Sequence, residues 1–404
     1  MAYEINEAKA LVVKAGKELV SSGLIARTWG NVSARISDTQ FVITPSGKPY
    51  ETLTPDDIVV VNIADLEYEG DIKPSSEKGV HADAYALRSE VNFVIHTHQI
   101  NASVLSPTGR GIKQVPKSAQ KVLGETIPCG AYGMPSTDKL RKGVANAVRN
   151  NPFSKAVIMK HHGALCMGAD YDEAFAVTAA LEDVCGKEIA KAMTFRTGKK
   201  YSADKLYKAF AKVHGISDKV EPCDLGSSEK VSNTVFKLLM KNGDEFYCNV
   251  VSGTALGGIA PRVALIHAAI YQSSDVTFIE QLDSADAVTL SCLGQGMKPH
   301  LDDFDQIAGF KVKCENWERS SYRTDAKDIG KALKGQNAVL VKGHGALCTG
   351  SSLSDVEAVK LVLEKECKTE MYCNICLCES PLSTLDDVLM RTIYLAKYSK
   401  QASK

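Results

Sequence analysis

The sequence has no excess of either charge sign. Its 404 residues include 48 Lys and Arg and 48 Asp and Glu, so the formal net charge is +0. A chain without a long-range positive field is poorly suited to concentrate nucleic acid or to adhere to an acidic membrane surface. We therefore expect no nucleic-acid partner and no membrane partner, but a small ligand that local groups recognise.

Long apolar runs and an export signal are also missing. The apolar run at residues 58–63 is far shorter than the roughly 20 residues that cross a bilayer. The N-terminal segment MAYEINEAKALVVKAGKELV mixes charged and apolar positions at helical spacing, which predicts an amphipathic helix rather than a signal peptide. Without export, the 12 cysteines would meet a reducing compartment. We expect a cytoplasmic protein with free thiols.

A segment near the middle of the chain recurs near its end. Residues 160–168 read KHHGALCMG and residues 342–350 read KGHGALCTG, so seven of nine positions are identical. The helical pattern that follows each segment also corresponds. Self-similarity of this extent predicts a tandem duplication. The length allows two ordinary domains, and we place them at residues 1–215 and 229–404, with a polar junction between them.

Hydrophobic period and helix punctuation predict alternating helices and short strands in the first copy. The expected helices cover residues 5–22, 78–89 and 138–150, with a long one from residue 171, and the expected strands cover residues 41–44, 58–62, 92–98 and 156–159. Hairpin-like strands among helices favour a mixed or antiparallel sheet between helical layers. The predicted fold class is α/β, a three-layer α/β/α domain that is present twice.

Histidines stand at the end of one predicted strand and directly after another. His96 and His98 end the strand NFVIHTH, and residues i and i+2 of a strand point to the same face. His162 follows the strand AVIM, and Gly163 allows a tight turn there. Three neutral imidazoles with one open position match the protein shell of a catalytic zinc. A structural role is the alternative for the HTH pair alone, but the three histidines together predict one divalent-metal site.

Glu77 lies in PSSEKGVH, where a proline and two serines precede a helical run. Taken alone, it is a first-turn carboxylate that complements the helix dipole. Hydroxyls and free backbone N–H groups at a helix start also form an anion site, so Ser75 and Ser76 are either caps or ligand contacts. The turns TWGNVS (residues 28–33) and TPSGKP (residues 44–49) offer further free N–H groups and short polar side chains.

The order of these segments resembles the class II aldolase/adducin family over residues 4–193, with the motifs RTWGNVSAR, ITPSGKPYETLTPDDIVVVN, PSSEKGVHADAY, VIHTHQINASVLS and KHHGAL. The resemblance implies Zn²⁺, or another divalent metal, at His96, His98 and His162, and Glu77 as the acid/base. It also implies contacts to a substrate phosphate from six residues: Gly30, Asn31, Ser46, Gly47, Ser75 and Ser76. The implied function is a metal-dependent aldehyde-lyase that reversibly cleaves a phosphorylated keto-sugar to dihydroxyacetone phosphate and an aldehyde.

Alternatives remain open within the resemblance. Glu after the paired serines matches the aldolases, whereas the 4-epimerase of the family carries Asp there. A sugar-phosphate epimerase or a sugar-acid phosphate decarboxylase could use the same metal shell, and an adducin-like interaction protein would need no catalysis. Fuculose phosphate aldolase also uses a Tyr a little beyond the HTH, but IKQVPKSAQ contains none here. Tyr132 or a residue of the second domain could replace it.

The second copy has lost most of the predicted site. In the register of the repeat the replacements are Val263 for Glu77, Gln281 for His96 and Asp283 for His98. His344 alone corresponds to a predicted metal ligand. The second domain is therefore predicted to be catalytically silent.

The remaining histidines and cysteines carry weaker functional signals. His81 and His267 occupy equivalent positions in both copies, including the one without a metal site, which favours a structural role. His161 either packs or supports its neighbour. Three cysteines form a CxxCxC pattern without the second cluster that would complete a metal site, namely Cys373, Cys376 and Cys378. The role of that pattern stays open.

The resemblance also predicts the assembly. Fuculose phosphate aldolase is a four-fold ring whose active sites lie between neighbouring subunits, so a silent copy could still provide the neighbouring face. Two tandem chains would close a ring of four domains, and we expect a homo-oligomer that is a dimer in solution. Light scattering checks this expectation, and a catalytically active monomer would contradict it.

Overall fold

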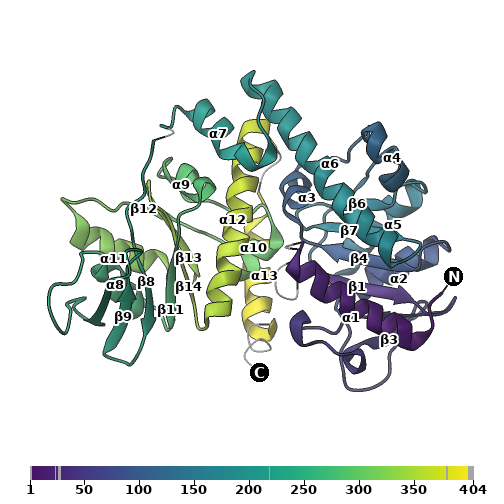
Figure 1. Cartoon of the computed structure of the whole chain (residues 1–404), viewed down its shortest axis with the longest axis horizontal. Coiled ribbons are helices and arrows are strands. Elements are labelled where there is room, and N and C mark those ends of the chain that lie inside the picture. The colour runs from purple at the N-terminus through teal and green to yellow at the C-terminus, as the bar shows by residue number, and fades with distance from the viewer. Residues whose placement is uncertain (1, 23, 26–28, 218, 379–380, 399–404) are drawn as a thin grey trace. The chain divides into compact units, whose positions relative to one another are not determined.

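The computed structural model describes residues 2–22, 24–25, 29–217, 219–378 and 381–398 (Figure 1). The chain divides into two compact units. The first comprises Met1–Ala192 and Leu395–Lys404, and the second comprises Met193–Tyr394. Residues 193–215, which the sequence assigned to the first domain, thus pack with the second unit, while the functional boundary stays a prediction.

One seven-stranded sheet forms the centre of the first unit, in the order β3-β2-β1-β4-β7-β6-β5. The strands are β1 Asn31–Arg35, β2 Gln40–Ile43, β3 Val59–Asn62, β4 Phe93–Thr97, β5 Cys129–Gly130, β6 Ala156–Met159 and β7 Ala164–Gly168. Every neighbouring pair is antiparallel except β5 and β6, which are parallel. The prediction of a mixed sheet is confirmed.

Helices cover both faces of this sheet. They are α1 Ile5–Ser21, α2 Lys78–Leu87, α3 Ile100–Leu105, α4 Lys117–Leu123, α5 Asp138–Asn150 and α6 Tyr171–Thr197. On one face, Val80 of α2 and Leu140 of α5 share a buried core with Val94 of β4. The preceding residue of the strand, Phe93, points to the opposite face, because successive strand residues alternate. Its ring meets that of Tyr171 of α6 edge-on, with the ring centroids 5.4 Å apart. The α/β/α layering is therefore present.

The sequence predicted α1, α2, α5, α6, β2, β3, β4 and β6 to within a few residues, but it missed β1, β5, β7, α3 and α4. β1 reads as polar because Ser33 does not face an apolar core. Its hydroxyl lies 2.6 Å from His81 Nδ1 and 2.7 Å from the Tyr85 hydroxyl. β7 follows β6 through a turn of only four residues, and the sequence analysis assigned the segment after this turn to no strand.

The second unit repeats the same topology, in the order β10-β9-β8-β11-β14-β13-β12. Its strands are β8 Ser227–Lys230, β9 Val235–Leu239, β10 Glu245–Asn249, β11 Phe278–Leu282, β12 Cys314–Glu315, β13 Ala338–Val341 and β14 Gly345–Gly350. Its helices are α7 Leu206–His214, α8 Ala264–Ser273, α9 Ala285–Ser291, α10 Asp302–Ile307, α11 Tyr322–Ala332, α12 Leu353–Cys376 and α13 Thr384–Ile393. The predicted fold is thus present twice.

Two further observations concern the whole described chain. None of the helices in the described ranges combines the length and the apolar character needed to cross a membrane. None of the twelve cysteines, all of which lie in the described ranges, forms a disulfide bond.

Candidate metal centre

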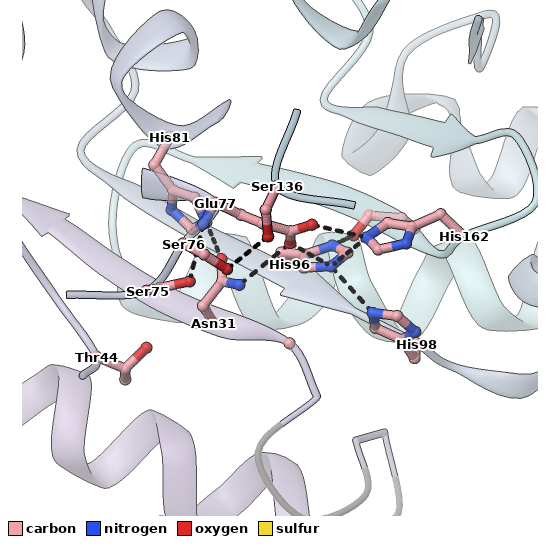
Figure 2. A network of polar contacts seen from close by, with 12 residues as sticks. Asn31, Thr44, Ser75, Ser76, Glu77, His81, His96, His98, Ser136 and His162 are labelled. Carbon is pink, nitrogen blue, oxygen red and sulfur yellow. Dashed lines mark hydrogen bonds and ion pairs between the residues drawn. The ribbon is translucent and has the colours of Figure 1, made fainter. Parts of the chain in front are cut away.

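Three imidazoles converge beside the C-terminal end of β4 (Figure 2). His96 Nε2 lies 3.1 Å from His98 Nε2 and 3.1 Å from His162 Nε2, and the nitrogens of all three lie within 4.8 Å of one another. A tetrahedral zinc with Zn–N bonds of about 2.0–2.1 Å holds its nitrogens about 3.3 Å apart. The spacing and the donor type therefore fit a divalent metal ion.

Strand register brings the histidines together. His96 pairs with Leu165 and Thr97 with Ala164 across β4 and β7, so the turn that precedes β7 lies beside the end of β4. His162 occupies that turn. Gly163 must follow it, because a Cβ there would lie 2.2 Å from the Thr97 carbonyl oxygen.

The His96 ring is held in one tautomer. Its Nδ1 lies 2.9 Å from the Ala164 carbonyl oxygen, and a carbonyl can only accept, so Nδ1 carries the proton. Nε2 faces the other two imidazoles and is the ring nitrogen that remains for a metal ion. A second hydrogen bond of this kind is typical of metal-binding histidines because it fixes the ring and raises its basicity.

Glu77 closes the fourth side of the cluster. It is the N-cap residue of α2, but its side chain makes no capping hydrogen bond. Instead, its carboxylate lies 3.1 Å from His96 Nε2 and 3.2 Å from His162 Nε2. Burial raises the pKa of Glu77, but His162 and His96 lower it more, so the pKa lies well below its ordinary value and the group is charged. The interpretation as a simple dipole-complementing residue is therefore insufficient.

The loops predicted to hold an anion lie next to this cluster. Pro45 and Pro74 form a β-bridge, Ser46 N donates to the Lys73 carbonyl, and Ser75 N donates to the Thr44 carbonyl. These contacts join the TPSG turn to the PSSE turn. They place Ser46 and Gly47, which has a φ of 76°, beside Ser75 and Ser76.

The third turn that the sequence predicts to bind an anion contains Gly30 and Asn31. Gly30 has a φ of 110°, and a Cβ there would lie 2.5 Å from the His96 carbonyl oxygen, so only glycine fits. Thr28 of the same motif lies outside the described residues. The structure therefore brings the described residues of all three turns to the three-histidine cluster.

His81 fixes Asn31. Burial lowers the pKa of His81 to about 3, so the ring is neutral. Its Nε2 contacts Asn31 Oδ1, and its Nδ1 accepts from Ser33. Asn31 Nδ2 is then directed at Glu77, with a distance of 3.4 Å to Oε2. The predicted structural role of His81 extends to orienting a site residue.

Two residues near the site were not predicted by pattern. The Ser136 hydroxyl donates to the Ser76 hydroxyl at 2.7 Å, as Figure 2 shows, and no periodicity or motif marked it. Tyr132, named only as a substitute for the missing Tyr, packs its ring edge-on against His161 at 5.4 Å. His161 itself has a φ of 61°, which is uncommon for a non-glycine residue and is often found at functional sites.

A family model relates this architecture to known proteins. The model described as "Class II Aldolase and Adducin N-terminal domain" matches residues 10–189 and matches again at residues 235–371. The chain belongs to the class II aldolase and adducin family. The two matches agree with a tandem duplication.

Several aldolases of this family are similar to the chain. The L-fuculose phosphate aldolase of Escherichia coli (strain K12) is 33% identical over 171 residues, which are 42% of this chain and 77% of that protein. A 5-methylthioribulose-1-phosphate/5-deoxyribulose-1-phosphate aldolase of Escherichia coli O45:K1 is 36% identical over 156 residues, 39% of this chain and 71% of that protein. The crystal structure of an L-fuculose-1-phosphate aldolase from Thermus thermophilus covers 48% of this chain and 97% of that one, at 26% identity and a TM-score of 0.41.

The second family domain gives an internal comparison. Gln281 pairs with Leu347 as His96 pairs with Leu165, which fixes Gln281 at the position of His96. Val263 is the N-cap residue of α8, as Glu77 is of α2. The register predicted from the repeat is thus confirmed at both positions.

Gln281 closes the position that His96 occupies in the first domain. Its Nε2 donates to the carbonyl oxygens of Cys223 and His344, both at 3.0 Å, and its Oε1 accepts from Leu225 N at 2.9 Å. His344 Nδ1 accepts from Cys223 N at 3.1 Å. The chain segment at residues 223–225 therefore hydrogen-bonds to the side chains of Gln281 and His344, which stand at the positions of His96 and His162.

The candidate site yields a prediction about metal content. We expect one divalent ion per chain and loss of most of it in His98→Ala, because the variant loses one of the three predicted imidazole ligands. His344→Ala, at the equivalent of His162, is the matched control and should keep the metal. Elemental analysis that finds two ions per chain, or full metal in His98→Ala, contradicts the assignment.

A second prediction concerns the closed site. Gln281→Ala leaves the Leu225 N–H and two carbonyl groups without their partner, so the free energy of unfolding of the second unit should fall by about 1–3 kcal/mol. Urea unfolding measures the change, and metal content should not change. A variant that is as stable as the wild type would show that these hydrogen bonds do not hold the segment.

Proposed function

We propose that the first domain is a metal-dependent sugar-phosphate aldolase that reversibly cleaves a phosphorylated keto-sugar to dihydroxyacetone phosphate and an aldehyde. One observation carries the proposal: a buried carboxylate lies within about one hydrogen-bond length of two imidazole nitrogens in a three-histidine cluster. The adjoining loops offer hydroxyls and amides suited to a phosphate. The similarity to aldolases supports the same reaction class.

His96, His98 and His162 would hold the ion in this proposal. When bound, a divalent cation would polarise the substrate carbonyl and stabilise the negative charge that develops on its oxygen. The protein contribution is to orient the three lone pairs. Strand register and the Nδ1 hydrogen bond of His96 do this before any ligand arrives.

Glu77 would move the proton at the reacting carbon. In the direction of condensation, its carboxylate takes a proton from the hydroxymethyl carbon beside the ketone of dihydroxyacetone phosphate. That carbon then forms a bond to the aldehyde carbonyl carbon, whose oxygen takes up a proton. In cleavage the hydroxyl on the carbon that becomes the aldehyde gives its proton to solvent as the carbon–carbon bond breaks, and Glu77, which has taken up a proton from solvent, gives that proton to the other carbon of the broken bond. General acid–base help of this kind typically contributes a factor of about 10² to 10⁴ in rate.

The three loops would bind the phosphate. The backbone and side-chain donors of Gly30, Asn31, Ser46, Gly47, Ser75 and Ser76 supply hydrogen bonds without a cationic side chain from this set. The N-terminus of α2 adds a favourable dipole for an anion. Binding of the substrate phosphate, which lies away from the reacting carbon, would hold that carbon against Glu77. Such positioning lowers the activation barrier, because less translational and rotational entropy is lost in the chemical step.

Two other functions could use the same fold. An epimerase or a decarboxylase would use the same three histidines, since both reactions also develop charge on a carbonyl oxygen. Product analysis separates these reactions. A non-enzymatic, adducin-like interaction protein would have no use for Glu77 and the three histidines together. The second domain, which is predicted to be catalytically silent, favours an interaction protein. Glu77 and the three histidines of the first domain argue against one.

Glu77→Gln tests the proton-transfer role. Glutamine keeps the shape of the side chain but cannot accept the proton, so kcat should fall by roughly a hundredfold or more while the metal content stays that of the wild type. Glu69→Gln, at an exposed position, is the matched control and should keep full turnover. A metal-loaded Glu77→Gln chain with near-normal kcat would remove Glu77 from the mechanism.

The aldehyde half of the substrate can be found by condensation. A panel of aldehydes offered with dihydroxyacetone phosphate should yield one or a few keto-sugar phosphates. If epimerised or decarboxylated products form from sugar phosphates instead, the rival reaction is the correct one.

A further inference from the structure

Ser136 lies in a tight turn before α5. Thr137, the N-cap residue of α5, accepts from Leu140 N through its side chain, and its own hydroxyl donates to the Met134 carbonyl oxygen at 2.6 Å. A second bond joins Thr137 N to the same carbonyl at 3.2 Å. The turn is therefore fixed to the helix, and so is the backbone of Ser136.

The backbone of Ser136 is in a conformation that serine seldom adopts. Its φ is 62°, in the left-handed region where a Cβ meets the neighbouring carbonyl oxygen. Glycine would adopt this conformation without that cost. A non-glycine residue that keeps such a conformation at the edge of a site suggests that its side chain has a function there.

The side chain of Ser136 points to one partner. Its hydroxyl donates to Ser76 Oγ at 2.7 Å, and both residues are exposed to solvent, beside the buried Glu77. Because the Ser76 oxygen accepts this bond, the Ser76 hydroxyl hydrogen is free to point elsewhere. Donation into a hydroxyl also polarises it and makes it a better donor.

The second domain again serves as a comparison. Ser320 precedes Ser321, the N-cap residue of α11, as Ser136 precedes the N-cap residue of α5. Ser320 is not among the residues with positive φ, and Arg262 stands where the first domain has Ser76. The domain without the predicted site residues thus also lacks both the strained backbone and its hydroxyl partner.

We propose that Ser136 is a positioning residue that directs the hydroxyl of Ser76 to the phosphate group of the substrate. This inference rests on the proposed function, because it assigns a phosphate to the loops around Ser76. The order of donation is from Ser136 to Ser76 and from Ser76 to a phosphate oxygen. Ser136 thereby sets affinity for the phosphate end of the substrate and takes no part in proton transfer at carbon.

The test uses inorganic phosphate as the probe and the full chain. Isothermal titration calorimetry should give a dissociation constant about three- to tenfold higher in Ser136→Ala than in the wild type, the size expected for loss of one hydrogen bond. KM for the keto-sugar phosphate should rise by a similar factor while kcat stays unchanged. Ser320→Ala is the matched control and should bind phosphate like the wild type.

Ser136→Gly separates this role from a structural one. Glycine removes the hydroxyl and also relieves the backbone, so this variant should melt above Ser136→Ala yet bind phosphate equally poorly. A purely structural serine predicts that both variants keep wild-type affinity. That result, or a wild-type chain that does not bind phosphate, overturns the proposal.

A double-mutant cycle tests the route through Ser76. If Ser136 acts through Ser76, then Ser136→Ala should have little further effect on phosphate affinity in a Ser76→Ala chain. Fully additive losses would mean that Ser136 acts independently of Ser76 and would contradict the proposal. A wild-type chain that binds phosphate in this Ser136-dependent way but cleaves no keto-sugar phosphate would contradict the proposed function alone.

Discussion

The pairing of β4 with β7 is the constraint on which the candidate site depends. It sets His96 opposite Leu165, directs alternate residues of β4 to the face covered by α2, and carries the turn with His162 to the end of the strand. A shift of one residue would turn His96 to the other face of the sheet. On its other side β4 pairs with β1, where Asn31 lies opposite His96. One strand therefore positions both the histidine cluster and part of the loops predicted to bind an anion.

The two domains show that this scaffold does not require its site. Both keep the strand order and a buried Ser–His–Tyr group, made by Ser33 in one domain and Ser228 in the other. In the second domain Gln281 stands at the position of His96. Its side-chain amide hydrogen-bonds to the backbone groups around that position. Buried polar groups need hydrogen-bond partners or ligands in both domains. A metal ion is the predicted ligand in the first domain, and the Gln281 side-chain amide supplies the hydrogen bonds in the second.

Much of this could be predicted from the sequence, because the signals were local or repeated. Hydrophobic period gave α1, α2 and β4, and the repeat gave the equivalence of Gln281 with His96 before any register was known. β1 was missed because it buries Ser33 against a histidine rather than in an apolar core. Ser136 was missed because its contact with Ser76 joins two exposed loops sixty residues apart, and no pattern within either loop reveals the other. The roles of the histidines, of Glu77 and of the anion-binding loops stay predictions, although the structure brings these residues together.

In the proposed reaction, the first domain labilises a carbon-bound proton next to the carbonyl of a phosphorylated ketone. Proton NMR of dihydroxyacetone phosphate in deuterium oxide tests this without knowledge of the aldehyde. The metal-loaded chain should exchange one of the two hydrogens on the hydroxymethyl carbon for deuterium, because a single carboxylate reaches that carbon from one side. Retention of both hydrogens in the presence of the metal-loaded chain would contradict the claim.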